Sequence, residues 1–327
     1  MRPVFFPKLK FPMTAFILLL CFVFAHPAIA TETKTLQIVH SAADFRLASH
    51  TNAFDMSQHG VSPKGAAKTT RYLSPVLPAA FAFNAVGAHW LAETPGGSTI
   101  TVFLRSSIDG QNWGKWLAIP HDEEPVAAFT EWGDPNRFAG EIAGALAFFN
   151  PESRFVQYRV DFSTTSAATA VLKRMSLQII RSSDWPTIEQ ILKSREGRGE
   201  RELSKSRSDA GKVAKPEMIK RSDWGAQAPR YDYSYTIVGH IAFHHTAGVS
   251  DYNVSTQDDC AARVRAIQSY HRNTLGWNDI GYAYAICKLG HIFQGREDDN
   301  DANDVRGAHD AFNSGSMGVA NLGYWVR

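Results

Sequence analysis

The chain has 327 residues, of which 44% are hydrophobic and 20% are charged, a composition typical of a globular protein. Its length exceeds that of a typical single domain, so about two domains are expected. The formal net charge is only +2, which gives no strong positive field of the kind that nucleic-acid-binding proteins carry. Nucleic acid is therefore not expected among the partners.

The first 30 residues have the three parts of a secretory signal peptide. Basic residues precede an apolar run over residues 11–25, and an A-I-A sequence ends at Ala30. We expect cleavage after Ala30 and a secreted, periplasmic or cell-envelope location. An uncleaved membrane anchor is the alternative, although the apolar run is shorter than the ~20 residues that span a bilayer. Cys21 lacks the preceding small residues of a lipoprotein signal, so no stable anchor is expected after processing.

Removal of this segment leaves two of the three cysteines, Cys260 and Cys287. An even pair of cysteines in an exported chain makes a disulfide between them plausible. Two buried free thiols are the alternative.

Residues 31–185 are expected to form an all-β domain. Apolar and polar residues alternate in short runs, of which the clearest are 100–104, 156–162 and 175–179. This period of two is typical of strands with one buried face. Turn residues at 95–97 and 108–110 separate such runs. The pattern predicts a β-sandwich or a jelly roll.

Residues 186–217 are expected to be a charged linker that marks a domain boundary. The segment contains no aromatic residue and many charged ones, so it cannot bury enough apolar surface to fold alone. A short helix around residues 188–194 is the exception.

Residues 218–327 have the element order of a mixed α/β domain. The expected elements are a buried strand over 236–243, a helix over 256–271, and strands that end near residues 286, 296 and 322.

Seven short segments of this region occur together, in this order: W-G-A, F-H-H-T-A-G, I-Q-S-Y-H, G-W-N-D-I-G-Y, Q-G-R, G-A-H and S-M-G-V-A-N-L-G. In order and spacing they resemble peptidoglycan recognition proteins and their relatives, the type 2 N-acetylmuramoyl-L-alanine amidases. The resemblance implies a central mixed sheet with flanking helices. It also implies a cleft that binds the peptide stem of peptidoglycan, so peptidoglycan and muropeptides are the expected partners.

The resemblance further implies zinc as the cofactor. In this family two histidines and a cysteine hold the ion and leave an open position for water. The metal polarises the amide carbonyl between the lactyl group and L-alanine, and it generates a hydroxide-like nucleophile. His244 matches the first zinc ligand, and Tyr282 matches the tyrosine that positions the water or stabilises the oxyanion. His245 is expected on the opposite side of the strand, in the core.

Six further residues are candidates for lining the cleft, with a purely structural role as the alternative for each. They are Thr246, His271, Trp277, Arg296, His309 and Asn313.

The family's second histidine and its cysteine belong to a G-H-x-x-x-x-x-x-x-C-P-G type segment that has no counterpart before Arg327. His240 and His244 cannot both be ligands, because four strand residues separate them by about 13 Å. Cys260 and Cys287 match other positions of the family pattern, and His309 stays open as a substitute ligand. Two functions therefore compete: a zinc amidase whose sequence is incomplete here, and a non-catalytic muropeptide-binding protein.

The sequence S-x-D-G-x-x-W-x-x-W resembles a motif of β domains that precede bacterial amidase domains. Its tryptophans are Trp113 and Trp116. On one interpretation they form a surface on which sugars stack, which makes a glycan-binding module a third possible function. On the other they cap the core beside a tight turn.

Overall fold

The computed structural model of the chain describes residues 33–48, 51–65, 69–121, 141–164, 168–196, 216–249, 253–296, 305–309 and 313–323. The expected signal peptide and most of the expected linker lie outside the described residues. None of the helices in the described part is long and apolar enough to cross a membrane.

Ten antiparallel strands form one sheet, which we call the β domain. They are β1 (Lys34–His40), β2 (Phe54–Ser57), β3 (Gly60–Pro63), β4 (Thr69–Leu73), β5 (Leu77–Glu93), β6 (Ser98–Ser107), β7 (Leu117–Ala118), β8 (Ile142–Ala143), β9 (Ala147–Thr164) and β10 (Val171–Arg181). The main strand order is β2-β3-β10-β5-β9-β6-β7, with β1 beside β10, β4 beside β9 and β8 beside β5. The prediction of an all-β domain is confirmed.

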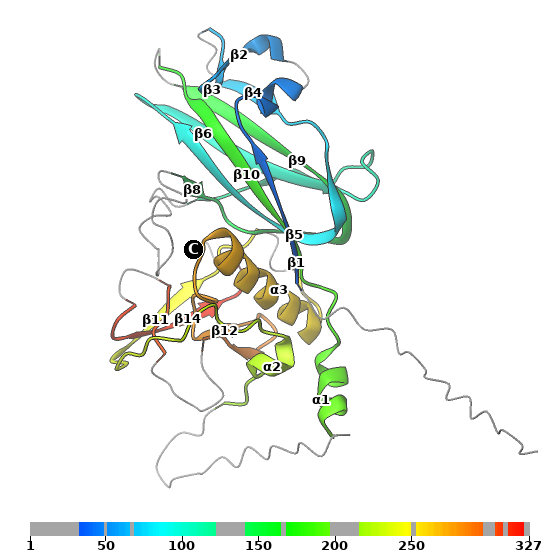
Figure 1. The fold of residues 1–327 in the computed structure, drawn as a ribbon, viewed down its shortest axis with the longest axis vertical. Coiled ribbons are helices and arrows are strands. Elements are labelled where there is room, and N and C mark those ends of the chain that lie inside the picture. The colour runs from blue at the N-terminus through cyan, green and yellow to red at the C-terminus, as the bar shows by residue number, and fades with distance from the viewer. Residues whose placement is uncertain are drawn as a thin grey trace, which may run out of the picture.

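The long strands β5 and β9 connect two layers around one core. Their register shifts between Pro78 and Phe83, and again between Phe83 and Ala85, so each strand pairs with different neighbours at its two ends. Val102 of β6 and Leu177 of β10 belong to the same buried cluster although their strands are not neighbours. Figure 1 shows these layers one over the other. The choice between a sandwich and a jelly roll stays a prediction.

A second, four-stranded sheet lies in what we call the C-terminal domain. Its elements are the helices α2 (Arg221–Trp224) and α3 (Gln257–Ser269), a π-helical turn (Tyr270–Thr274), and the strands β11 (His240–His245), β12 (Tyr284–Ile286), β13 (Ile292–Gln294) and β14 (Ser316–Asn321). The order is β11-β14-β12-β13; β14 is parallel to β11 and β12, and β13 is antiparallel to β12. The sheet is therefore mixed, as predicted.

Helix α3 covers one face of this sheet. Thr256 and Asp259 form a capping box at its N-terminus, which satisfies backbone N–H groups that have no partner within the helix. Val264 and Ile267 of α3 share a buried cluster with Phe293 of β13. The structure also contains the disulfide between Cys260 and Cys287, with their Cα atoms 6.0 Å apart, which ties α3 to the end of β12.

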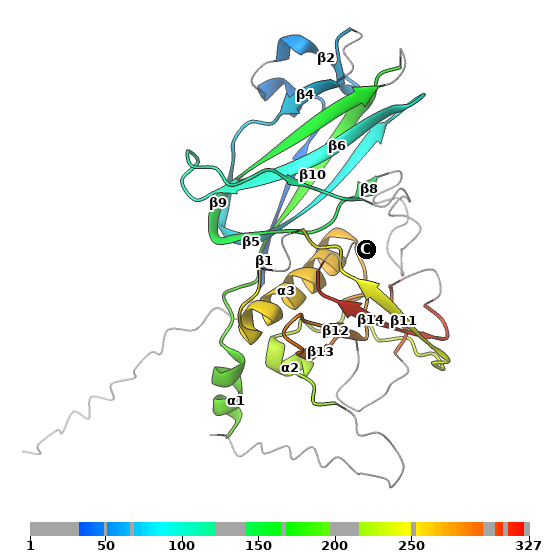
Figure 2. The ribbon, with the colours of Figure 1, turned by 180° about the vertical axis from the view of Figure 1, so that it is seen from behind.

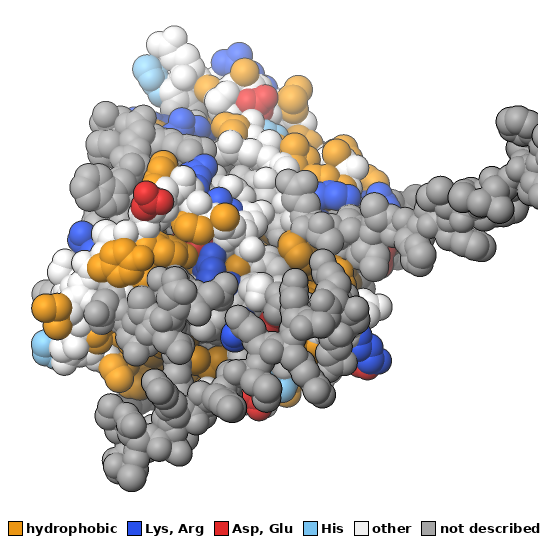
Figure 3. Space-filling view, turned by 60° about the horizontal axis from the view of Figure 1, so that its bottom comes forward, with side chains coloured by type: hydrophobic (Ala, Val, Ile, Leu, Met, Phe, Trp, Pro, Cys, Tyr) orange, Lys and Arg blue, Asp and Glu red, His pale blue; other side chains and the backbone are white. Residues whose placement is uncertain are grey.

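The prediction of a buried strand over residues 236–243 is wrong in position and in burial. The strand begins at His240, and Ile241 is 58% exposed and Phe243 71% exposed. His245 is exposed as well, not a core residue. The reason is that β11 is an edge strand, and α3 covers only the opposite face. Hydrophobic side chains accordingly reach the surface on the side of the molecule that the C-terminal domain forms (Figure 3).

The end of the β domain packs directly on α3 (Figures 1 and 2). Phe148 of β9 and Ile180 of β10 belong to the same buried cluster as α3. The Tyr270 hydroxyl donates a hydrogen bond to the Gly144 carbonyl at 2.9 Å, and the Ser182 hydroxyl donates one to the Ala262 carbonyl at 2.9 Å. The helix expected near residue 188 is present as α1 (Ile188–Glu196). The sequence analysis expected a linker between the two domains and did not predict that the β domain packs on α3.

Candidate functional site

Three rings from separate parts of the C-terminal domain meet beside the sheet. His244 lies near the end of β11, Tyr282 precedes β12, and His309 belongs to the segment before β14. The centroid of the His244 ring lies 4.8 Å from that of His309 and 5.8 Å from that of Tyr282. The His244 Nε2 and His309 Nδ1 atoms are 2.9 Å apart and share a hydrogen bond. The structure therefore brings together His244, Tyr282 and the candidate substitute ligand His309.

Two glycines make room for the His309 ring. A Cβ atom at Gly318 would lie 2.4 Å from His309 Cδ2, and a Cβ at Gly307 would lie 2.5 Å from the same atom. Any larger side chain at either position would displace the ring. The close approach of the His309 ring thus explains why glycine occupies these positions of the S-M-G and G-A-H segments. The sequence alone did not reveal this.

Polar contacts fix the segment that carries His309. Its backbone N–H donates to Asn313 Oδ1 at 2.8 Å, and the Ser316 hydroxyl lies 3.3 Å from His309 Nε2. Thr246 has a similar role at the ends of the parallel strands: its hydroxyl accepts a hydrogen bond from the Gly323 N–H at 3.0 Å. The described contacts of Asn313 and Thr246 therefore hold the backbone around the rings.

His271 forms the buried floor beside Tyr282. Its ring centroid lies 4.4 Å from that of Trp277 and 5.6 Å from that of Tyr282. The Gly281 N–H donates to His271 Nδ1 at 3.0 Å, so this nitrogen carries no proton. Burial, with a smaller contribution from the positive charge of Arg296, lowers the pKa of His271 to about 3. The imidazole is consequently neutral at physiological pH.

Arg296 is 1% exposed and is bonded to backbone carbonyls. Its Nε donates to the Ile280 carbonyl at 2.6 Å, and its Nη1 donates to the Arg306 carbonyl at 2.9 Å. These bonds fasten the segment before Tyr282 to the segment before His309. Arg296 thereby connects two of the three chain segments that supply the rings.

Asp279 holds the segment before Tyr282 through a second set of contacts. The sequence analysis gave this residue no role. The carboxylate is fully buried and forms an ion pair with Arg221 at 2.7 Å. It also accepts hydrogen bonds from the Tyr233 hydroxyl and the Gln268 amide, both at 2.6 Å. Burial and the negative charge of Asp279 raise the pKa of Tyr233. The sequence offered one sign of this ion pair. The G-W-N-D-I-G segment contains a carboxylate, and an arginine precedes it by 58 residues.

The two imidazoles of the site are spaced nearly as two ligands of one zinc ion would be. Two nitrogens that bind one tetrahedral zinc at 2.0–2.1 Å are about 3.4 Å apart, so the 2.9 Å between His244 Nε2 and His309 Nδ1 is close to that spacing. A zinc site needs at least a third protein ligand. In the described part of the chain no three His, Cys, Asp or Glu side chains are arranged to hold a metal, and Cys260 and Cys287 form a disulfide. The described residues thus supply two donors and do not fit a complete zinc site.

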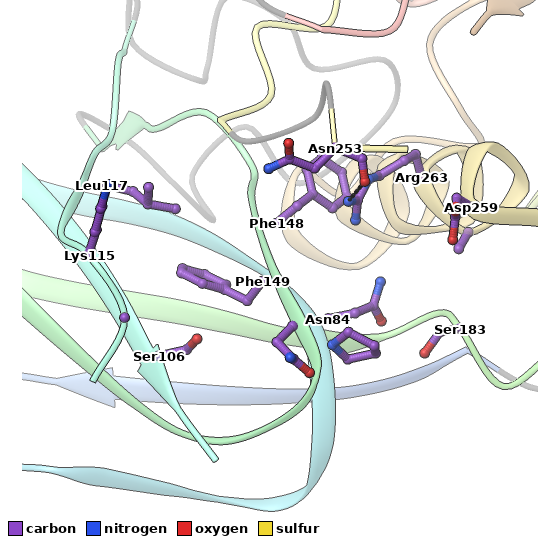
Figure 4. Close-up of a pocket in the computed structure, with 14 residues that line it drawn as sticks. Asn84, Ser106, Lys115, Leu117, Phe148, Phe149, Ser183, Asn253, Asp259 and Arg263 are labelled. Carbon is purple, nitrogen blue, oxygen red and sulfur yellow. Dashed lines mark hydrogen bonds between the residues drawn. The ribbon is translucent and has the colours of Figure 1, made fainter. Parts of the chain in front are cut away.

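A separate cleft of about 460 Å³ lies between the β domain and α3 (Figure 4). Lys115 and Leu117 line it from the β domain, Asn253 from the segment before α3, and Asp259 and Arg263 from α3 itself. The residues that the family resemblance singles out are absent from its walls. This cleft is therefore separate from the ring cluster at Tyr282.

The C-terminal domain is similar in sequence to peptidoglycan-recognition proteins of insects and humans. Peptidoglycan-recognition protein SC2 of Drosophila simulans is 35% identical over 108 residues, which are 32% of this chain and 54% of that protein. Peptidoglycan recognition protein 3 of Homo sapiens is 35% identical over 113 residues, 34% of this chain and 31% of that protein. The solved structure of bumblebee PGRP-SA is 30% identical, with a TM-score of 0.30, over 33% of this chain and 62% of that one. No family model matches. The chain spans about half the length of the first of these relatives.

Proposed function

We propose that the C-terminal domain binds muropeptides, on the premise that about a third of the chain is 35–36% identical to peptidoglycan-recognition proteins. The site that we propose is the ring cluster of His244, Tyr282 and His309 with the floor formed by His271 and Trp277. The observation that carries the proposal is the contact between His244 and His309 beside Tyr282. It assembles three of the seven family-type segments at one place.

The chemistry of the cluster supports a peptide stem as the ligand. A muropeptide stem carries amide groups, which donate and accept hydrogen bonds, on a short apolar chain. Imidazole and phenol groups offer both donors and acceptors, and the partly exposed ring of Tyr282 provides apolar surface. Binding sites of this kind combine apolar walls with a few fixed polar groups. Export to the envelope would bring the chain to this substrate.

Hydrolysis of the N-acetylmuramoyl-L-alanine bond is the second candidate function. The spacing of His244 Nε2 and His309 Nδ1 favours it, since the two nitrogens approach each other as two metal ligands do. The described donor set remains one ligand short. We therefore propose binding as the activity of the chain and treat hydrolysis as a property to be measured.

Calorimetric titration of the chain with a monomeric muropeptide tests the proposal. We expect saturable binding that Tyr282→Ala and His309→Ala each weaken by roughly tenfold or more, which corresponds to about 1.4 kcal/mol. His59→Ala is the matched control, because His59 is exposed in the β domain, and it should bind as the unmodified chain does. If the unmodified chain fails to bind the muropeptide, the proposal is wrong.

A further inference from the structure

The guanidinium of Arg105 lies between two tryptophan rings. Its Cζ atom is 4.5 Å from the centroid of Trp113 and 4.4 Å from that of Trp116. Arg159 extends the stack, with its Cζ 3.8 Å from the centroid of Phe103 and 5.2 Å from that of Trp116. All of these distances are within the range of cation–π contact. We call these five residues the stacked face.

The stacked face lies on the outer surface of the β domain. Along β6 the core side chains are Val102 and Leu104, both fully buried, while Phe103 and Arg105 alternate with them and are partly exposed. Trp113 and Trp116 are also partly exposed and lie outside the buried clusters of the described residues. The tryptophans are thus not members of the buried core. Their rings form a surface, and Arg105 is its centre.

Hydrogen bonds to Gln157, and no ion pair among the described residues, hold Arg105 in place. Its Nε and Nη2 donate to Gln157 Oε1 at 3.1 and 2.6 Å, and Gln157 in turn donates to the Ser74 carbonyl at 3.0 Å. Within the described residues the ion pairs include none to Arg105, whereas Arg159 pairs with Asp161 at 2.9 Å. Desolvation, together with the nearby charge of Arg159, lowers the pKa of Arg105. A fixed guanidinium with this environment attracts an anion.

The other members of the stacked face determine what kind of anion fits. A planar indole presents a negative π face that packs against the face of a pyranose chair from which axial C–H groups project. Trp113 and Trp116 flank the charge on both sides, so a ligand with rings on either side of a carboxylate would match the surface in shape and in charge. A glycan that carries regularly spaced carboxylates has this arrangement.

We propose that the stacked face binds a peptidoglycan glycan strand from which the stem peptides have been removed. Each N-acetylmuramic acid of such a strand has a free lactyl carboxylate for Arg105, with sugar rings on both sides for Trp113 and Trp116. This choice of glycan rests on the proposed function of the C-terminal domain. The face itself is on β6, the loop after it and β9, apart from β12 and β14 (Figure 1), so the two sites can be tested separately.

The test measures binding of the full chain to four ligands: stem-free glycan strands, chitin oligomers, the monomeric muropeptide and single-stranded DNA. Chitin has a related sugar backbone and no carboxylate. We expect the stem-free strand to bind about tenfold tighter than chitin, and Arg105→Gln to abolish that difference. Trp116→Ala should weaken binding of both glycans by roughly tenfold. Arg154→Gln, at an exposed arginine of β9, is the matched control and should change neither.

Three results would overturn the proposal: equal affinity for stem-free strands and chitin, no change on Arg105→Gln, or tighter binding of single-stranded DNA than of the glycan. The muropeptide titration on the same samples separates the two sites. Arg105→Gln should bind the muropeptide normally and lose its preference for stem-free strands over chitin. That result supports the stacked face as a site separate from the muropeptide site. If the unmodified chain binds the muropeptide but does not bind stem-free strands, glycan binding by the stacked face is overturned and the proposed muropeptide site is not. Equal thermal unfolding of Arg105→Gln and the unmodified chain excludes misfolding as the cause.

Discussion

His271 is neutral in the folded protein because it is buried against Trp277 and Tyr282. Its pKa is about 3 when folded and about 6.5 when unfolded, so the unfolded chain binds the extra proton between these values. The free energy of unfolding should therefore be unaffected by this group above pH 6.5. It should fall by up to about 1.4 kcal/mol per pH unit as the pH drops from 6.5 towards 3.

Denaturant titrations between pH 7 and 4 check this expectation. His271→Asn retains an acceptor for the Gly281 N–H and removes the titrating group, so it should flatten the pH dependence. His59→Asn, at an exposed histidine, should leave it unchanged. Identical pH slopes for His271→Asn and the unmodified chain would contradict a buried neutral histidine.

Gly318 controls the position of His309. An added Cβ would lie 2.4 Å from the His309 ring, so Gly318→Ala should push the ring away from His244 at a cost of about 1–3 kcal/mol in stability. Muropeptide affinity should fall with it. Gly239→Ala is the control, because its Cβ would have ordinary contact at 3.8 Å. Equal muropeptide affinity of the two variants would show that the position of His309 is unimportant.

The sequence predicted the strands and the helix whose apolar residues recur at a regular spacing along the chain. β6 alternates from Ser98 to Arg105 and β9 from Tyr158 to Phe162, because one face of each strand lies on the shared core. β10 has an alternating sequence, although its residues from Met175 to Ile180 are all buried. Helix α3 was placed within two residues of its observed ends, Gln257 and Ser269, since Thr256 marks its start. β11 was misplaced because an apolar run does not reveal that its strand lies at an edge.

The site was less predictable than the elements. Motif resemblance selected His244 and Tyr282 individually. The contact between His244 and His309 joins residues 65 positions apart, and no local spacing contains that information. Asp279 was missed for the same reason, since its partner Arg221 is distant in sequence and comes close only in the folded chain.

The disulfide between Cys260 and Cys287 joins α3 to the end of β12. It closes a loop of 27 residues, for which the chain-entropy model gives roughly 3–4 kcal/mol of stabilisation. Non-reduced mature protein should contain almost no titratable thiol, and Cys260→Ser with Cys287→Ser should lower the free energy of unfolding by about that amount. Two thiols per chain in the non-reduced protein would refute the link.

The count of metal donors among the described residues predicts how the chain behaves with zinc. Of these residues, His244 and His309 supply a two-ligand site, and a site of only two ligands loses zinc to water readily. The purified chain should therefore hold clearly less than one zinc and release little or no stem peptide with a free L-alanine amino group from peptidoglycan. Metal analysis beside a peptide-release assay checks both. One bound zinc together with turnover that His309→Ala abolishes would show that a third ligand completes the site.

The β domain packs on α3 through Phe148, Ile180 and the Tyr270 hydroxyl, so both parts must be present when the site is measured. Hydrogen exchange of the full chain, with and without a monomeric muropeptide, locates the ligand most directly. We predict that the muropeptide slows exchange in the segments around residues 277–286 and 305–309, and that Tyr282→Ala removes this protection. Protection confined to the β domain, or none at saturating muropeptide, would contradict a muropeptide site at His244, Tyr282 and His309.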